Sequence, residues 1–561
     1  MKPAAFSAES RHQAWRSLPD EPVDLLVVGG GITGAGIARD AAGRGLTVVL
    51  AEAGDFARGT STTSSRLVHG GLRYLETRDF GLIFEASVER RRLLDLAPHL
   101  VRPLPFLFPV YPESDVGYRM LQAGMWLYDG LSLFRNIRRH RMLRRDAALE
   151  AEPELRAEGL VGAAHYYDAG VDDGRLTLVS ARAAHEAGAY VLSHTEVTGF
   201  DRSGTGQHDL SGARLRDRLS GETRTLATRV VINAAGPWSD ELRRMADPDA
   251  TPRLRPTKGV HIMVSRKRLA NRNAIIFNSP IDGRVMFLLP WGDFAYVGTT
   301  DTDYSGSPAD VRADQEDIDY LLASANHVFP GRQLGEEDVL STWAGLRPLL
   351  APRTQVSEGQ TSREHDVWRD LSGLLNIGGG KLTTFRRMAR DAADRASEIL
   401  RREHGVRSAS STTYDAPFPG APDEPMESFE RRVVEDARTC GLDEGVGHHL
   451  ARTHGTDALM ILSRVRDDAA RGERIVSTLP YLWAEVDHAV ESEMALRLED
   501  VLRRRTHIFY ERADGGLEVA RQVAERMAGL PGLGWNRETI EEEIATYTAS
   551  VRTSRGVAVH A

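Results

Sequence analysis

The chain has 561 residues, of which 41% are apolar and 27% charged, and its formal net charge is -9 at pH 7. This length predicts two or three packed units, a size that is able to bury a large cofactor, and the charge argues against nucleic acid as the main partner. No apolar run reaches the roughly 18 residues of a membrane span, and the single cysteine, Cys440, excludes an intrachain disulfide framework. We therefore expect a cytoplasmic protein whose membrane contact is at most peripheral.

The N-terminal region predicts a lead-in followed by a βαβ unit. Residues 1–23 carry neither the apolar region of a signal peptide nor a convincing transit peptide, and we expect them to be flexible. The apolar runs 24–28 (DLLVV) and 46–52 (LTVVLAE) then flank a glycine-rich turn and a helix-compatible segment, ITGAGIARDAAGRG. Two short apolar strands around a helix are the pattern of a βαβ unit.

The glycine turn predicts a dinucleotide site. Gly29, Gly31 and Gly34 form G-x-G-x-x-G directly after the first strand, where the backbone can approach a pyrophosphate at a helix N-terminus. Glu52 closes the second strand, and its carboxylate can accept hydrogen bonds from ribose hydroxyls. The motif alone does not separate NAD from FAD.

The elements that follow predict three units in space. Residues 229–233 form another strand of the first sheet, segments between 258 and 300 alternate as antiparallel strands, and 371–403 return to the first unit as strand, glycine turn and long helix. Four prolines break the region before position 427, after which the spacing is helical. The predicted units are a discontinuous cofactor domain (20–100, 170–245 and 335–405), a substrate domain (101–169 and 246–334), a linker (406–426) and a helical C-terminal domain (427–550).

Two further segments favour a long cofactor. Residues 60–66 form a hydroxyl-rich loop, and Gly378-Gly379-Gly380-Lys381 begins a helix far along the chain. A helix N-terminus aimed at the N1 and C2 carbonyl of a flavin would stabilise its anionic reduced form, and Lys381 adds positive charge there. A phosphate-binding loop of the nucleotide triphosphatases is excluded, because position 375 is Leu where that motif requires Gly.

These motifs, together with HGGLRYLE, NAAGPW, KGVHIMV, WAGLRPL and GGGKLTTFRRMA, resemble the FAD-dependent glycerol-3-phosphate dehydrogenases of the D-amino-acid-oxidase-like flavoprotein group. The resemblance covers most of the chain. It implies an α/β fold, α+β overall, with a Rossmann-like FAD-binding domain, a substrate domain with an antiparallel sheet and a helical C-terminal domain. It also implies hydride transfer from C2 of sn-glycerol 3-phosphate to flavin N5, giving dihydroxyacetone phosphate, with a membrane quinone as electron acceptor.

The resemblance also implies roles for individual residues. His261, Arg347 and Lys381 are the expected catalytic residues, with His261 as the leading candidate for the base. Arg73, Tyr74, Arg347 and Arg363 are expected to bind the substrate, since arginine forks match phosphate oxygens. FAD is expected to be noncovalent, held by Gly29, Gly31, Gly34, Glu52, Ser64, Ser65, His69, Ala235, Gly236, Gly380, Lys381 and Thr383.

Several alternatives stay open at this point. Residues 118–145 combine large apolar side chains with arginines, which suits either a lipid interface on the inner face of the cell membrane or a packed helix with a basic end. Arg503-Arg504-Arg505 is interpreted as a structural or surface helix end, and His448, His449 and His454 show no metal spacing, so no metal is expected. The rival functions are a glycerol-3-phosphate oxidase that uses O2, an amine or amino-acid oxidase, a nicotinamide dehydrogenase and a noncatalytic FAD redox sensor; a homodimer is possible.

Overall fold

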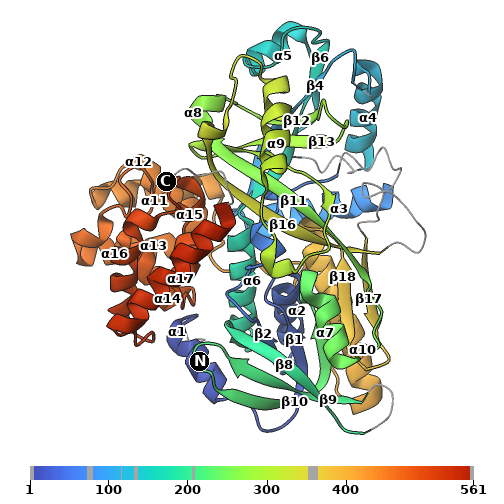
Figure 1. Cartoon of the computed structure of the whole chain (residues 1–561), viewed down its shortest axis with the longest axis vertical. Helices are drawn as coiled ribbons and strands as arrows, with labels where there is room; N and C mark the ends of the chain where they lie inside the picture. The colour runs from blue at the N-terminus through green and yellow to red at the C-terminus, as the bar shows by residue number, and fades with distance from the viewer. Residues whose placement is uncertain are drawn as a thin grey trace.

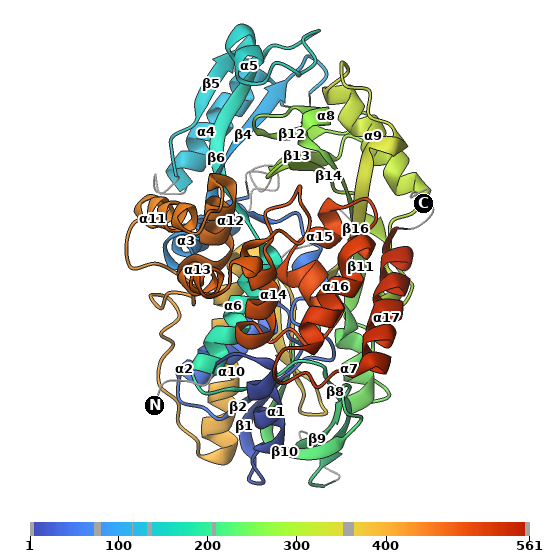
Figure 2. The ribbon, with the colours of Figure 1, turned by 90° about the vertical axis from the view of Figure 1, so that its left-hand side faces the viewer.

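The computed structural model describes residues 5–71, 80–114, 116–131, 137–204, 209–351 and 364–555. Figure 1 shows the first sheet with its helices at the bottom, the second sheet at the top and the C-terminal helices at one side. Figure 2 shows those helices lying across the face of the two sheet-bearing units. None of the described helices combines the length and apolarity that a membrane-spanning segment needs.

The first sheet has the strand order β17-β18-β10-β1-β2-β7, in which all neighbours are parallel except β17 and β18. β1 and β2 are buried along their whole length because helices cover the sheet, which explains their uninterrupted Val and Leu. The predicted βαβ unit, the strand at 229–233 and the returning strand before the GGGKLTT turn are confirmed. The elements are β1 (Val23–Val28), α2 (Ile32–Gly43), β2 (Val48–Ala51), α6 (Asp173–Glu186), β7 (Tyr190–Leu192), β10 (Thr223–Asn233), β17 (His365–Arg369), β18 (Leu375–Gly379) and α10 (Phe385–His404). β9 (Leu210–Asp217) pairs with β10 and β8 (Thr195–Arg202) pairs with β9, while α7 (Ser239–Ala246) follows β10.

The second sheet runs β15-β11-β14-β13-β12-β4-β6-β3, with β16 on β11 and β5 on β6. Its pairs are antiparallel except β12 with β4, which confirms the predicted antiparallel sheet. Its strands are β3 (Leu67–Val68), β4 (Val101–Val110), β5 (Arg141–Arg144), β6 (Gly162–Val171), β11 (Leu254–Ser265), β12 (Ala274–Asn278), β13 (Val285–Trp291), β14 (Phe294–Gly298), β15 (Thr302–Asp303) and β16 (Val339–Leu350). The helices of this unit are α3 (Phe80–Leu96), α4 (Tyr118–Leu131), α5 (Arg145–Ala151), α8 (Arg266–Leu269) and α9 (Gln315–Val328).

β16 crosses the boundary between the predicted domains. It lies in 335–405, the stretch predicted for the cofactor domain, yet it pairs with β11 from Leu254 opposite Leu350 to Val264 opposite Val339. A strand joins the sheet that offers it hydrogen-bond partners, and those partners lie far away in sequence. The pairing matters for the site because it carries Arg347 to the interface between the two sheets.

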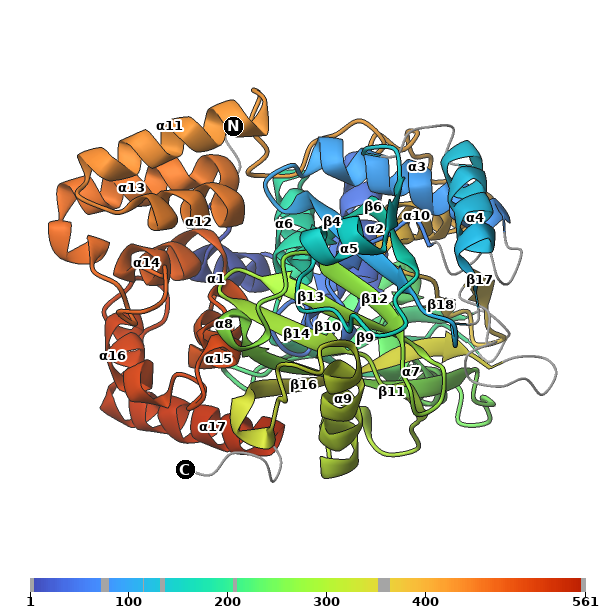
Figure 3. The same ribbon diagram turned by 90° about the horizontal axis from the view of Figure 1, so that it is seen from above.

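The C-terminal domain is helical, as predicted. Residues 405–425 contain neither helix nor strand, and α11 begins at Met426. The helices are α11 (Met426–Thr439), α12 (Glu444–His454), α13 (Ala458–Asp467), α14 (Trp483–Ser492), α15 (Ile508–Glu511), α16 (Leu517–Ala528) and α17 (Arg537–Arg555), and a π-helical turn, η10 (Asp500–Arg505), precedes α15. Figure 3 shows this domain on the side opposite α3 and α4.

The expectation of a flexible N-terminal lead-in is wrong for the residues that the structure describes. Helix α1 (Ala8–Arg16) begins with a capping box in which Ser7 and Ser10 bond each other's backbone. Arg11 is fully buried, and its guanidinium donates to both carboxylate oxygens of Asp217 at 2.7 and 2.9 Å. The anchoring partner is 206 residues away, so nothing within the segment itself indicated that it would be ordered.

Candidate cofactor and substrate site

A cavity of about 650 Å³ lies between the two sheets. One end is bordered by the glycine turn after β1 and the other by residues of β13, β16 and the loop after β14. A volume in this range is that of a small-molecule or cofactor site. The predicted cofactor residues that line it are Gly29, Gly31, Glu52, Ser64, Ser65, His69, Ala235, Gly236, Gly380, Lys381 and Thr383.

The glycine turn is shaped by close backbone contacts. Gly29 has a φ of +112°, a conformation that residues with a side chain rarely adopt. Gly34 does not line the cavity, but a Cβ there would lie 1.8 Å from the carbonyl oxygen of Gly29. The helix N-terminus is held in place by Ser61, whose Oγ accepts a hydrogen bond from Ile32 N at 2.9 Å. The turn therefore presents the N-terminus of α2 to the cavity, as pyrophosphate binding requires.

Glu52 stands at the end of β2 with both oxygens oriented by the backbone. Gly30 N donates to Oε2 at 2.6 Å and Gly54 N donates to Oε1 at 2.8 Å. A carboxylate has about four acceptor sites, so two hydrogen bonds leave capacity for the hydroxyls of a ribose. The contacts fix the carboxylate against the cavity wall, the place where an adenosine ribose is expected.

The distal GGGKLTT segment contacts His69, the residue that follows β3 of the second sheet. Gly379 and Gly380 have φ values of +73° and +83°, which turn the chain from β18 into the start of α10. Thr383 Oγ1 accepts a hydrogen bond from His69 N at 3.1 Å and donates to His69 O at 3.2 Å. Lys381 precedes this turn and lines the cavity. Two segments 314 residues apart thus form one wall.

Arg347 projects from β16 into the other end of the cavity. Its Nη1 donates to Asp301 Oδ1 at 2.8 Å, and its Nη2 donates to Thr299 Oγ1 at 3.1 Å and to Thr300 O at 3.2 Å. These contacts fix the plane of the guanidinium while its side chain stays 22% exposed to the cavity. A fixed, planar cation of this kind is suited to an anionic group on a small molecule.

His261 lies behind the cavity wall. The ring is 2% exposed, stacks on Trp343 with centroids 4.9 Å apart, and places Nε2 2.9 Å from Ser65 Oγ. Burial, followed by the positive charges of Arg347 and Arg66, holds the pKa of His261 well below its usual value. Ser65 lines the cavity and His261 does not, so His261 reaches the cavity through the Ser65 hydroxyl.

Comparison with known proteins decides the family. A family model described as FAD dependent oxidoreductase matches residues 24–395, and one described as C-terminal domain of alpha-glycerophosphate oxidase matches residues 411–540. The aerobic glycerol-3-phosphate dehydrogenase of Staphylococcus saprophyticus is 36% identical over 94% of each chain. The glycerol-3-phosphate dehydrogenase 2 of Mycobacterium bovis is 39% identical over 98% of this chain and 91% of that protein. This chain belongs to the FAD-dependent glycerol-3-phosphate dehydrogenase family.

A solved structure agrees with this membership along the whole chain. The glycerol-3-phosphate dehydrogenase from Bacillus halodurans complexed with FAD superposes with a TM-score of 0.80 at 32% identity, covering 98% of both chains. FAD is therefore the cofactor of this flavoprotein family member, and the cavity fits it. A Cβ at Gly34 would collide with the glycine turn that is expected to hold the pyrophosphate. The carboxylate of Glu52 lies where the ribose is expected, and the segment that leads into α10 lies where the flavin is expected.

Three predicted substrate residues, Arg73, Tyr74 and Arg363, lie outside the described residues. The cavity has a further cation that the sequence did not single out. Arg284, the last residue of the loop between β12 and β13, lines the cavity and donates to Asp301 O at 2.6 Å, so it shares Asp301 with Arg347. The sequence predicted only an alternating strand there. The one available signal was Arg284 itself, the first residue of RVMFLLPW, directly before the apolar residues.

The histidines of α12 do have carboxylate partners, contrary to the expectation from their spacing. His449 Nε2 and His454 Nε2 lie 2.8 and 2.9 Å from the same oxygen of Glu485, which comes from α14. The other ring nitrogens face Thr453 Oγ1 at 3.2 Å and Arg175 at 3.1 Å. Every ring nitrogen of this pair therefore has a hydrogen-bond partner of its own, as in a structural network. That no metal binds stays a prediction.

Proposed function

We propose that the chain oxidises the C2 hydroxyl of sn-glycerol 3-phosphate to give dihydroxyacetone phosphate. One observation carries the proposal: the glycine turn for a dinucleotide and the fixed guanidinium of Arg347 face a single cavity. The relatives named as glycerol-3-phosphate dehydrogenases support it, since they cover almost the whole chain. When bound, FAD supplies the hydride acceptor, N5 of the flavin.

The substrate phosphate would be held at the cationic end of the cavity. Arg347 offers a planar fork that matches two phosphate oxygens, and Arg284 adds a second guanidinium from the neighbouring hairpin. Lys381 borders the same cavity from the cofactor domain and would stabilise negative charge on the flavin side. Arg73, Tyr74 and Arg363 complete the proposed substrate site.

His261 is the proposed proton acceptor, acting through Ser65. In this step Ser65 Oγ takes the proton of the C2 hydroxyl while it passes its own proton to His261 Nε2, 2.9 Å away. The lowered pKa keeps the imidazole neutral and able to accept, and stacking on Trp343 holds its plane. Arg347, near the same wall, would polarise the hydroxyl during transfer.

The electrons are proposed to leave for a membrane quinone beside α4. This helix buries Leu121 and Met125, while Met120, Trp126 and Leu127 are 67%, 53% and 46% exposed. Exposed arginines follow in the same region, at positions 138, 139 and 141. Large apolar side chains next to arginines suit the headgroup boundary of an anionic membrane. The proposed location is therefore the cytoplasmic face of the cell membrane, as a monomer or a homodimer.

Vesicle binding tests this surface directly. Trp126→Ser together with Leu127→Ser should lower cosedimentation with anionic vesicles several-fold, because both side chains are more than 40% exposed. Met460→Ser is the matched control, because Met460 is also 44% exposed. It lies on α13, away from α4, so this substitution should leave vesicle binding unchanged. Equal binding by all variants would remove this surface from the proposal.

Anaerobic titration with sn-glycerol 3-phosphate tests the reaction. Loss of the oxidised flavin band at roughly 450 nm is expected as substrate is added. A flavin spectrum that ignores this substrate would favour the noncatalytic sensor or an amine oxidase instead.

A glycerol-3-phosphate oxidase is the second candidate function. The match of residues 411–540 to the C-terminal domain of alpha-glycerophosphate oxidase favours it, whereas the curated relatives favour the dehydrogenase. Reoxidation of the reduced enzyme separates the two. Fast reaction with a soluble quinone and slow production of hydrogen peroxide are expected; the reverse order would identify an oxidase.

A further inference from the structure

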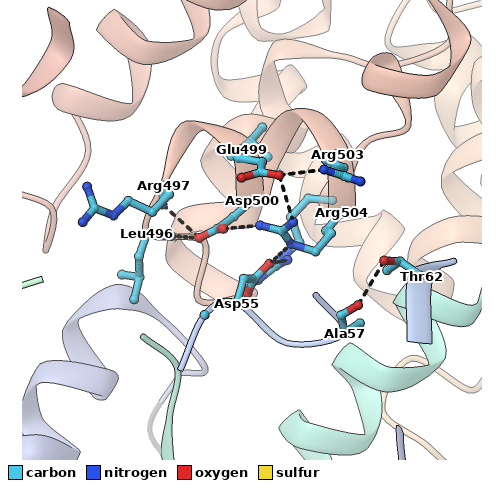
Figure 4. Close-up of polar contacts among 12 residues, drawn as sticks. Asp55, Ala57, Thr62, Leu496, Arg497, Glu499, Asp500, Arg503 and Arg504 are labelled. Carbon is cyan, nitrogen blue, oxygen red and sulfur yellow. Dashed lines mark hydrogen bonds and ion pairs between the residues drawn. The ribbon is translucent and has the colours of Figure 1, made fainter. Parts of the chain in front are cut away.

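The C-terminal domain reaches the cofactor loop through two buried arginines. Asp55 lies in the loop between β2 and β3 and is 1% exposed. Its Oδ2 accepts hydrogen bonds from Arg504 Nε at 2.6 Å and from Arg505 Nη1 at 2.7 Å, and its Oδ1 accepts one from Arg505 Nη2 at 2.9 Å. Figure 4 shows Arg504 of the π-helical turn η10 pointing at Asp55. Both arginines are about 450 residues from Asp55 in sequence.

These contacts are directed and fully desolvated. Arg504 and Arg505 are 5% and 3% exposed. Their positive charges are balanced by the carboxylates of Asp500 and Asp55. Burial opposes the charged guanidinium, yet the carboxylate of Asp55 raises the pKa of Arg504 and of Arg505 above the usual value. Forked hydrogen bonds between buried opposite charges allow little angular freedom. Asp55 is therefore held at one place relative to η10.

The same network holds the strand that lies beside Glu52. Asp500 Oδ1 accepts from Arg504 at 2.6 Å, and Asp500 Oδ2 lies 3.2 Å from His194 Nε2. His194 N donates to Gly54 O at 2.7 Å, and the next residue, Thr195, donates from its N to Glu52 O at 2.6 Å. The backbone carbonyls of Glu52 and Gly54 are thus connected through His194 and Thr195 to one helical turn of the C-terminal domain.

The loop needs such support because its backbone is strained. Ala57 and Arg66 have φ values of +65° and +52°, a region that non-glycine residues seldom adopt. Ala57 N donates to Gly30 O, and Thr62 Oγ1 donates to Ala57 O at 3.0 Å, as Figure 4 shows for the second contact. Strained conformations persist only where the surroundings determine them.

At its far end the loop meets the C-terminal domain again. The guanidinium of Arg66 lies over the rings of Trp291 at 4.3 Å and of Tyr510, in α15, at 5.2 Å. Between Asp55 and Arg66 the loop carries Ser61, Ser64 and Ser65, which line the cavity. Both ends of the cofactor loop are therefore held by residues 493–511, although none of these C-terminal residues lines the cavity itself.

We infer that the C-terminal domain is a positioning element for FAD: Arg504 and Arg505, acting on Asp55, hold the loop 52–66 in the conformation that binds the cofactor. The inference goes beyond the proposed function. It concerns FAD binding in the absence of substrate, so its failure and the failure of the proposed reaction are separate results. Asp55, Arg504 and Arg505 are positioning residues, since they act through the loop.

The test measures the dissociation constant of FAD for the full-length apoprotein, with quenching of flavin fluorescence as the readout. Asp55→Asn keeps the size of the side chain and removes its charge, and Arg505→Lys keeps the charge and removes the fork. Each should weaken FAD binding about tenfold or more, as expected if the competent loop population falls to about one tenth. Unchanged affinity in a folded variant would overturn the inference.

A matched control separates loop positioning from general stability. Asp457 forms an ion pair with Arg182 of α6, so it also joins the C-terminal domain to the cofactor domain, but neither residue lines the cavity. Asp457→Asn should lower the melting temperature of the apoprotein while changing the FAD dissociation constant less than about twofold. If it weakens FAD as much as Asp55→Asn does, the effect is general loosening and the inference fails.

The wild-type protein supplies a readout that needs no variant. Coupling between two sites is reciprocal, so FAD must stabilise the C-terminal segment that stabilises its loop. Hydrogen exchange should show slower exchange on FAD addition in peptides covering 496–511, and unchanged exchange in α11 to α13. Equal protection of all C-terminal helices, or none in 496–511, contradicts the inference even if every variant fails to fold.

Discussion

Arg347 is the residue whose replacement gives the clearest test of the substrate site. In Arg347→Met the cavity loses a cation, and Asp301, 7% exposed, loses the 2.8 Å ion pair that balances its charge. Charge-assisted hydrogen bonds contribute about 1.5–3 kcal/mol each, and the unbalanced Asp301 then repels a phosphate dianion. A total of about 3 kcal/mol corresponds to a loss of about two orders of magnitude in kcat/KM.

The assay compares two substrates under an artificial electron acceptor. If Arg347 binds the phosphate as well as polarising the C2 hydroxyl, Arg347→Met should lower kcat/KM for sn-glycerol 3-phosphate much more than it lowers that for glycerol. The double variant Arg347→Met with Asp301→Asn should recover part of the loss, because it removes the unbalanced carboxylate. Bound FAD per chain serves as the control for folding. An equal loss for both substrates would refute phosphate binding and assign Arg347 to the reacting hydroxyl; a loss below about threefold would refute both roles.

Three further outcomes follow from the structure. Gly34→Ala should abolish FAD binding, because its Cβ would lie 1.8 Å from Gly29 O, whereas Gly43→Ala on the same helix, with 3.5 Å to its nearest neighbour, should retain FAD. His261→Gln should lower kcat without shifting the pH profile of kcat/KM, because burial lowers the pKa of His261 far below the assay range; an acid limb near neutral pH that disappears in the variant would contradict this. Burial, with Arg175 as the next cause, lowers the pKa of His99 to about 3. As the pH falls below the usual pKa of histidine, His99 therefore takes up a proton in the unfolded chain and stays neutral in the folded chain. Stability should then fall by about 2 kcal/mol between pH 8 and pH 5, and His99→Gln, compared in urea melts at the two pH values, should lose that part of the pH dependence.

The sequence by itself determined the parts of this protein that depend on neighbouring residues. The βαβ unit, the glycine turn with Glu52, the antiparallel strands and the helical C-terminal region were all predicted, because each follows from periodicity or a local turn within a few tens of residues. The glycine positions are a local steric requirement: a side chain at Gly34 clashes with Gly29, five residues earlier. The family resemblance then added the cofactor and the expected substrate.

Only the tertiary structure decided which charged groups meet. Arg11 orders the N-terminus through Asp217, Arg505 holds the cofactor loop through Asp55, and His261 reaches the cavity through Ser65. With 71 Lys and Arg and 80 Asp and Glu in the chain, spacing cannot select these pairs. An ion pair or hydrogen bond depends on separation in space, and the chain path that brings distant segments together is set by packing of the two sheets and the C-terminal helices.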